Sequence, residues 1–303
     1  MEYYSDQING AQPRDVEIIP PNVWGGIVSI VNGLIASGAF GKNFPEECPD
    51  GQGVYATNEE AFKLSLCAEV PDIEYPFVTE ETIGEGYFSE KKPYSPNYLS
   101  VLDLIQFCHE HVAKPIQGSH HSFFNHYHLS FDCDEGKEEF RNRVNRIFSR
   151  NRISYELKDT GNIIRLAPEV LSDALNTARF TTPDSTLNRM LEESRDKFLS
   201  PDEVIRRESL ERLWDAWERI KTVLKPESKK VSATLLLDKC SSEKNFRELL
   251  DEEAKKLTTI GNKFHIRHSE VGQIEIQTSE QIDYIFHRLF SFILLVSKGL
   301  VEL

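Results

Sequence analysis

The chain has 303 residues, of which 39% are hydrophobic and 28% are charged, a composition typical of a globular protein with about two domains. Its formal net charge of −14 excludes an overall field that attracts nucleic acid or an anionic membrane, so any such binding must depend on local groups of charges. The five cysteines are scattered and form no C-x-x-C pair, which argues for a reducing compartment and against a disulfide framework or a thiolate zinc site.

The first 115 residues are strongly acidic, with 18 carboxylate side chains against 6 lysines and arginines. The polar, acidic N-terminus is unlike a signal peptide. Apolar residues at three- and four-residue steps predict helices, and Thr57 with Glu60 has the spacing of a capping box that begins the second helix. The expected elements are helices over residues 22–37, 57–70 and 100–114, with a loop over residues 71–96.

Residues 116–180 are electrically balanced and are predicted to contain both strands and a helix. The aromatic stretch "FFNHYHLSFD" predicts a strand, and "GKEEFRNRVNRIFSR" predicts a helix with one apolar face. The stretch "RISYELKDTGNIIRLA" predicts a hairpin that turns at residues 159–162. Residues 1–180 are therefore predicted to form an α+β N-terminal domain.

Residues 181–303 are predicted to form an all-α domain. Ser200 and Glu203 have capping-box spacing at the start of a long helix with Pro201 at its first position, and Thr278 begins the last helix. That last helix is apolar nearly all round, so it belongs in the middle of a bundle. Polar residues interrupt every apolar run before it reaches the length of a membrane span, so we expect a cytoplasmic protein without membrane contact.

The stretch "KFHIRHSE", residues 263–270, places an arginine directly before a histidine where a polar helix ends. The planar guanidinium of Arg267 suits phosphate, and His268 titrates near neutrality. Such a pair can cleave a phosphodiester, one group stabilising charge and the other moving a proton. Arginine and histidine are also favoured at helix C-termini, where they only satisfy terminal carbonyls. The residues that could orient or assist the pair are Asn262, His265 and Glu270.

His287 lies in the last predicted helix, which in a bundle can pass close to residues 262–268. It is therefore a candidate acid or base beside Arg267, although a hydrogen-bonded core histidine is the plainer alternative. A three-histidine metal set of His265, His268 and His287 is a weak possibility, because the spacing is loose and neighbouring bases oppose a cation.

A second histidine-rich stretch, "GSHHSFFNHYHLSF", contains four of the nine histidines. On a strand, His126 and His128 share one face with Asp132, and an H-x-H pair of this kind can bind a metal. No further ligand is fixed by the spacing, so a structural or substrate-facing role is favoured. We expect no metal and no cofactor, with His126 and His128 as the weak alternative.

The predicted helix and hairpin over residues 137–166 form the one locally basic feature of the chain. Arg143, Arg146 and Arg150 follow one another at three- and four-residue steps, so they form one positive face of the helix. Such a face can contact the phosphate backbone of a nucleic acid. It can equally pair with the acidic residues 1–115, within the molecule or in a dimer.

The stretch "FRNRVNRIFSRNRISYELKDTGNIIRLAP" resembles the end of the N-terminal domain in AbiJ-like abortive-infection proteins. In such proteins a C-terminal helical domain of the HEPN superfamily follows, often with an Ile-Arg-His tripeptide late in the bundle, and this chain has Ile266-Arg267-His268 there. HEPN sites place a histidine about four to six residues after the arginine, whereas His268 follows Arg267 directly.

The resemblance implies a HEPN-like bundle over residues 181–303 that forms a homodimer and cleaves or binds RNA in phage defence or a toxin system. Many HEPN domains are metal-independent endoribonucleases, so Arg267, His268 and His287 would be catalytic and no cofactor would be needed. The alternative is a non-catalytic interaction or regulatory module, in which the acidic N-terminal domain binds a protein partner and the bundle dimerises.

Overall fold

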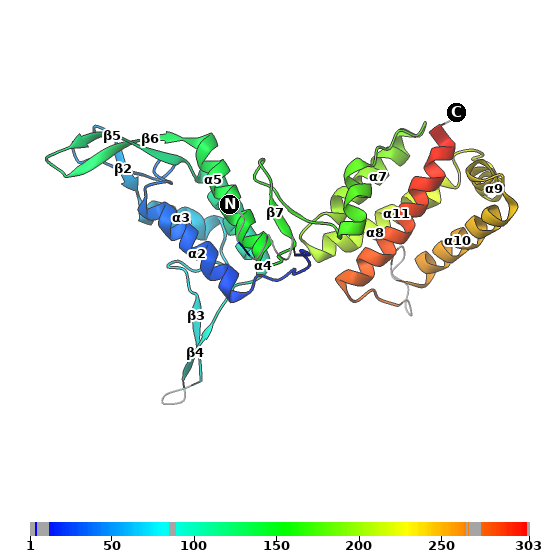
Figure 1. The fold of residues 1–303 in the computed structure, drawn as a ribbon, viewed down its shortest axis with the longest axis horizontal. Coiled ribbons are helices and arrows are strands. Elements are labelled where there is room, and N and C mark those ends of the chain that lie inside the picture. Colours follow the sequence, from blue (N-terminus) through cyan, green and yellow to red (C-terminus); the bar gives the residue numbers. More distant parts are fainter. Residues whose placement is uncertain (1–3, 5–11, 85–88, 265, 267–273, 302–303) are drawn as a thin grey trace. The chain divides into compact units, whose positions relative to one another are not determined.

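The computed structural model describes residues 4, 12–84, 89–264, 266 and 274–301 (Figure 1). Contacts divide the chain into two compact units, Met1–Leu166 and Ala167–Leu303. The first unit contains helices and strands and the second is helical, which confirms the predicted order of an α+β region followed by an all-α region. The predicted domain boundary after residue 180 stays a prediction.

Four helices form the frame of the first unit. They are α2 (Pro21–Ala36), α3 (Glu59–Glu69), α4 (Tyr98–His111) and α5 (Cys133–Arg150). The predicted apolar stripe of α2 is confirmed, since Trp24, Ile27 and Val31 are fully or nearly fully buried. The indole N–H of Trp24 donates to the carbonyl of Val78 at 2.8 Å, so this tryptophan belongs to the core of the first unit.

The strands of the first unit pair as separate antiparallel hairpins. They are β1 (Pro45–Glu47) with β2 (Val54–Thr57), β3 (Glu80–Ile83) with β4 (Glu90–Pro93), β5 (Lys114–His121) with β6 (His126–Asp132), and β7 (Tyr155–Leu157) with β8 (Ile163–Arg165). The predicted loop over residues 71–96 is wrong in part, because β3 and β4 pair there. Every residue of these two strands is exposed, so no apolar alternation marked them in the sequence.

The hairpin of β7 and β8 is packed tightly against α5. Tyr155 and Leu157 are fully buried, and the side chain of Asn145 in α5 both donates to the carbonyl of Leu157 and accepts from its N–H, each at 2.9 Å. In the turn, Gly161 has a positive φ of 88° and lies against the imidazole of His109 in α4. The predicted hairpin is confirmed, and apolar burial fixes its position.

The second unit is an assembly of helices around one aromatic and aliphatic core. Its helices are α6 (Glu169–Thr177), α7 (Ser185–Phe198), α8 (Glu203–Ile220), α9 (Lys229–Cys240), α10 (Lys244–Lys263) and α11 (Ser279–Val301). The rings of Phe198 and Phe286 stack with centroids 3.9 Å apart, which joins α7 to α11. The predicted buried face of α8 is confirmed, including Trp214 and Trp217.

The end of α10 packs very closely against α8. The indole N–H of Trp214 donates to the carbonyl of Leu257 at 3.2 Å. A Cβ added to Gly261 would lie 2.2 Å from the indole nitrogen, so only glycine allows this approach. This contact fixes the last turn of α10, which leads into the stretch that carries the predicted catalytic residues.

Two predicted helix starts are displaced by one or two residues. Asn58 caps α3 by accepting from Ala61 N–H at 2.9 Å, while the hydroxyl of Thr57 accepts from the N–H of Phe40 at 3.2 Å. Asp202 caps α8, because its carboxylate accepts from Val204 N–H at 2.8 Å. The shifts arise because a neighbouring asparagine or aspartate is an equally good cap. None of the described helices is both long enough and apolar enough to cross a bilayer.

Candidate functional site

The stretch that carries the predicted catalytic residues is held at both of its ends. Phe264 forms a parallel β-bridge with Ile274, and the N–H of Ile274 donates to the carbonyl of Lys263 at 3.1 Å. Ile266 is only 2% exposed and belongs to the core of the second unit. The base of the stretch is therefore anchored at the end of α10.

Only two of the predicted catalytic and supporting residues can be placed. Asn262 is exposed in the last turn of α10, and His287 is half-buried in α11. The others lie outside the described residues: His265, Arg267, His268 and Glu270. The predicted pairing of Arg267 with His268 or His287 therefore stays a prediction.

A cavity of about 410 Å³ lies at the end of α10, and we call it the lysine cavity. Its charged lining consists of cations alone: Lys255, Lys256, Lys263 and Arg288. Lys255 pairs with Asp251 at 2.5 Å. Within the described part of the chain, no carboxylate lies at ion-pair distance from Lys256 or Lys263, and both lysines are exposed. The cavity therefore presents to solvent two positive charges that make no direct ion pair among the described residues, although the carboxylate of Glu253 is near enough to interact with the charge of Lys256.

Arg288 plays a different part in the same cavity. Its guanidinium makes two hydrogen bonds to the carboxylate of Glu253, at 2.7 and 2.9 Å. These bonds lower the pKa of Glu253 and raise the pKa of Arg288, so both groups are ionised. The pair joins α10 to α11 in a bidentate contact and largely neutralises itself. The attraction for an anion therefore rests on Lys256 and Lys263.

A larger, mainly apolar cavity of about 700 Å³ adjoins the lysine cavity. The two cavities share the side chains of Ile260, Phe264 and Arg288. The larger cavity also contains Ile274 and Tyr284, which are 57% and 63% exposed. An exposed aromatic and aliphatic surface next to cations is the combination that binds single-stranded nucleic acid, because bases stack while phosphates meet the positive charges.

The predicted basic face of α5 is exposed in the first unit. Phe140, Val144 and Phe148 are buried on one side of the helix, while Arg143 and Arg146 are exposed on the other. Among the described residues, no carboxylate pairs with either arginine. Arg150 is also exposed, at the last position of the helix.

Two arginines of the predicted basic region that lie outside α5 are paired with carboxylates of the same unit. Arg152 binds Asp15 at 2.6 Å, and Arg165 binds Glu17 at 2.7 Å. Pairing with the acidic residues 1–115, which was the alternative for the basic region, therefore accounts for these two arginines but not for Arg143 and Arg146.

The two histidines of the weak metal alternative lie side by side on β6. The rings of His126 and His128 have centroids 5.5 Å apart, and Cys48 lies beside both of them. Asp132 does not join them. It caps α5 by accepting from the N–H of Glu135 at 3.0 Å.

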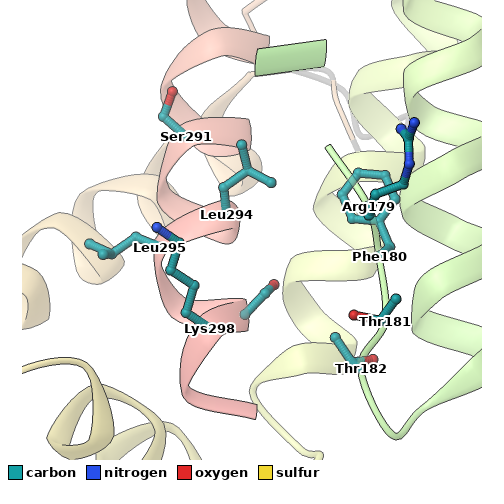
Figure 2. A pocket seen from close by; sticks show the side chains of 9 residues that line it. Arg179, Phe180, Thr181, Thr182, Ser291, Leu294, Leu295 and Lys298 are labelled. Carbon is teal, nitrogen blue, oxygen red and sulfur yellow. The ribbon is translucent and has the colours of Figure 1, made fainter. Parts of the chain in front are cut away.

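A separate cavity of about 430 Å³ lies between residues 179–182 and the last turns of α11 (Figure 2). It contains two cationic side chains, but Figure 2 shows the guanidinium of Arg179 and the ammonium of Lys298 pointing away from one another. Arg179 donates to the backbone carbonyl of Ala178 at 3.1 Å. The cations do not converge on one point, so this cavity is a poorer candidate for an anion than the lysine cavity.

Sequence reasoning did not identify Lys256, Lys263 or Cys48 as site residues. The two lysines lie seven positions apart on α10, on the same side of the helix, and this spacing was visible in the sequence. Cys48 had no comparable signal, because its histidine neighbours lie on a different hairpin far along the chain.

Comparison with known families gives one finding. The profile described as AbiJ N-terminal domain 4 matches residues 2–181, which is more than half of the chain. No curated protein and no solved structure matches the chain.

Proposed function

Because the chain belongs to the AbiJ N-terminal domain 4 family, which indicates a role in abortive infection, we propose that it acts on RNA in this defence response. The C-terminal unit is proposed to be a HEPN-like bundle that binds RNA at the end of α10 and cleaves it. The protein is proposed to work in the cytoplasm, as a homodimer through its helical unit.

The lysine cavity is the observation that carries this proposal. In a chain of net charge −14, Lys256 and Lys263 stand unpaired among the described residues, at the anchored base of the stretch with Arg267 and His268. Two positive charges at one cavity attract a phosphate, and the adjoining apolar cavity offers surface for a base. The exposed arginines of α5 supply a second region for contact with the backbone.

The proposed reaction is transfer of the phosphodiester to the neighbouring 2′-hydroxyl, without metal. One histidine, His268 or His287, removes the proton from the 2′-hydroxyl, whose oxygen attacks phosphorus. The bond from phosphorus to the 5′ oxygen breaks, and the other histidine donates a proton to that oxygen. Arg267 stabilises the charge on the phosphorane. The products are a 2′,3′-cyclic phosphate and a 5′-hydroxyl.

The test is incubation of the purified protein with total RNA, with and without a chelator, followed by mapping of new ends. Arg267→Lys should abolish cleavage in a folded protein, because a point charge cannot replace the planar guanidinium, and loss of such a stabiliser costs roughly a hundredfold or more in rate. A fully active Arg267→Lys variant would exclude a catalytic role for Arg267. The remaining role would be the alternative one, in which the arginine only satisfies carbonyls at the C-terminus of a helix.

A second pair of variants tests the lysine cavity itself. Lys256→Ala with Lys263→Ala should weaken RNA binding and reduce the salt dependence of the affinity by about one unit for each phosphate that is no longer neutralised. Lys244→Ala is the matched control, because Lys244 is also exposed on α10 but lies at the opposite end of the helix. If Lys244→Ala weakened RNA binding as much as the double variant does, the lysine cavity would not be the RNA site.

A non-catalytic interaction module is the second candidate, and the spacing of the tripeptide favours it. His268 follows Arg267 directly instead of lying about four to six residues later, as in HEPN sites. In this case the bundle dimerises and the acidic N-terminal unit binds a protein partner. Absence of any RNA binding would support it. A monomer mass by light scattering at micromolar concentration would contradict the proposed dimer in both candidates.

A further inference from the structure

Five side chains of the kinds that bind metals meet at one place in the first unit. Two come from the loop between β1 and β2, and three come from the hairpin of β5 and β6. They are Cys48, Asp50, His121, His126 and His128. Figure 1 shows β2 beside this hairpin, at one end of the unit. We call this group the Cys-His cluster.

Local backbone structure holds the two hairpins so that these side chains meet. The loop after β1 is tight, because the N–H of Cys48 donates to the carbonyl of Gly53 at 2.7 Å and the N–H of Gly51 donates to the carbonyl of Cys48 at 2.8 Å. On β6, His126 and His128 are two positions apart and share one face. His121 is the direct cross-strand partner of His126.

The three imidazole rings lie close to one another. Ring centroids are 5.5 Å apart for His126 and His128, 5.6 Å for His121 and His128, and 5.7 Å for His121 and His126. Imidazoles bound to one tetrahedral zinc ion have centroids roughly 5 Å apart, given Zn–N distances of about 2.0 Å. The observed triangle is therefore only slightly wider than that of a metal site.

The potential ligand atoms also lie close to one another. The sulfur of Cys48 and one nitrogen each from His126 and His128 are all within 4.8 Å of one another, as are potential ligand atoms of Cys48, Asp50 and His121. Neighbouring ligands of tetrahedral zinc are roughly 3.3–3.6 Å apart. The ligand atoms of each set of three are therefore near enough for small side-chain rotations to bring them around one ion.

Two polar atoms of the cluster are buried without a partner. The Nε2 atoms of His126 and His128 make no hydrogen bond with any described residue, and both atoms are shielded from solvent. Buried imidazole nitrogens are normally hydrogen-bonded, because an unmet donor or acceptor loses its hydration without compensation. A cation between them would satisfy both atoms in their neutral, unprotonated form.

The chemistry of the side chains also suits a cation. The cluster combines a thiol, a carboxylate and imidazoles, and a metal ion would displace the proton of the Cys48 thiol on binding.

We propose that Cys48, His126 and His128 bind a zinc ion, and that the hydrogen-bonded pair of Asp50 and His121 supplies the fourth ligand. A thiolate with imidazoles is a typical zinc ligand set. Asp50 and His121 lie 2.6 Å apart, which is the carboxylate–histidine contact that orients a ligand in such sites. The ion would join the loop after β1 to the hairpin of β5 and β6. This proposal is independent of RNA cleavage, since its ligands all lie in the first unit.

The first experiment measures zinc in protein purified without added metal and then dialysed. About one zinc ion per chain is expected for the wild type, and Cys48→Ser or His126→Ala should remove it. The matched controls are Cys67→Ser and His120→Ala, because Cys67 is an exposed cysteine and His120 is an exposed histidine of the same hairpin. Zinc retained in Cys48→Ser, or lost equally in the controls, would overturn the proposal.

The second experiment avoids the risk that a variant does not fold. Wild-type protein is stripped with a chelator and titrated with cobalt(II), which reports thiolate coordination by a charge-transfer band in the near ultraviolet. We expect the band to saturate at one equivalent and to be absent in folded Cys48→Ser protein. A wild-type protein that gives no such band, and takes up no zinc from an excess of the ion, has no site at the Cys-His cluster.

Discussion

The hairpins β7–β8 and β5–β6 have the same topology but are stabilised in different ways. The two ends of β7 and of β8 are buried, and Leu157 is fully inaccessible to solvent. Most of β5 is exposed, and Phe123 in the turn of its hairpin is 84% exposed. An isolated two-stranded hairpin is marginal in water, so both hairpins depend on contacts with the rest of the unit. Apolar burial holds β7 and β8, whereas β5 and β6 have half-buried contacts with β2 and α5, to which a metal ion would add. The Cys-His cluster is the additional anchor that we propose.

The largest expected effect is on the apolar hairpin. Leu157→Ala removes a fully buried side chain beneath α5, so it should lower the free energy of unfolding by about 2–5 kcal/mol. Chemical denaturation of the first unit measures this loss, and it should be the same with and without zinc. Ile116→Ala on β5 is the control, because Ile116 is 48% exposed and should cost far less.

Zinc removal should have the next largest effect, confined to the other hairpin. A ligand present at 100 to 1,000 times its dissociation constant stabilises by about 3–4 kcal/mol, and stripping it removes that stabilisation. Hydrogen exchange should then become faster in β5, β6 and the loop after β1, while β7 and β8 stay protected. If zinc removal made hydrogen exchange equally faster in both hairpins, the hypothesis that each hairpin has its own anchor would be wrong.

Acidification should weaken the apolar hairpin through His109. Burial, with Lys137 and Arg141 nearby, lowers the pKa of this histidine, which lies under the turn at Gly161. Below the ordinary histidine value of about 6.5, the unfolded chain binds a proton that the folded chain does not, so stability falls as the pH falls through this window. In zinc-free protein, His109→Gln should make the melting temperature less sensitive to pH. An unchanged pH profile would exclude His109 as the cause.

The smallest expected effect on stability concerns the arginines of α5. Arg143→Ala with Arg146→Ala should change the free energy of unfolding by no more than about 0.5 kcal/mol, since both side chains are exposed and unpaired among the described residues. The same change should weaken RNA binding and lower its salt dependence. Arg152→Ala is the comparison, because Arg152 binds Asp15 and its loss should affect stability more than RNA affinity. An unchanged salt dependence would mean that this face of α5 contacts protein.

The sequence predicted helices and strands correctly where buried residues recur at a regular spacing along the chain. The stripes of α2 and α8 and the hairpin of β7 and β8 were predictable, because Trp24, Trp214 and Leu157 occupy positions of a buried face. The strands β3 and β4 were missed, because exposed strands of glutamate and lysine have no apolar alternation. Helix starts were misplaced where Asn58 and Asp202 compete with nearby hydroxyls.

The sequence does not reveal groups of side chains that are distant along the chain and meet in space, and the proposed Cys-His cluster is of this kind. The H-x-H pair of His126 and His128 was visible, but no spacing rule connects it to Cys48 across α3 and α4. Local chemistry suggested Asp132 as the further ligand, and the structure uses it as a helix cap instead. A ligand set divided between two hairpins becomes visible only when their pairing is known.

The positions of the three tryptophans allow the two units to be distinguished by fluorescence. Trp24 is buried in the core of the first unit, whereas Trp214 and Trp217 are buried in the core of the second. Each unit therefore carries its own intrinsic fluorophores. In a Trp24→Phe protein the tryptophan emission comes from the second unit alone, and the difference from the wild type isolates the first. Unfolding of the two units can thus be followed separately in one intact chain, without an extrinsic label.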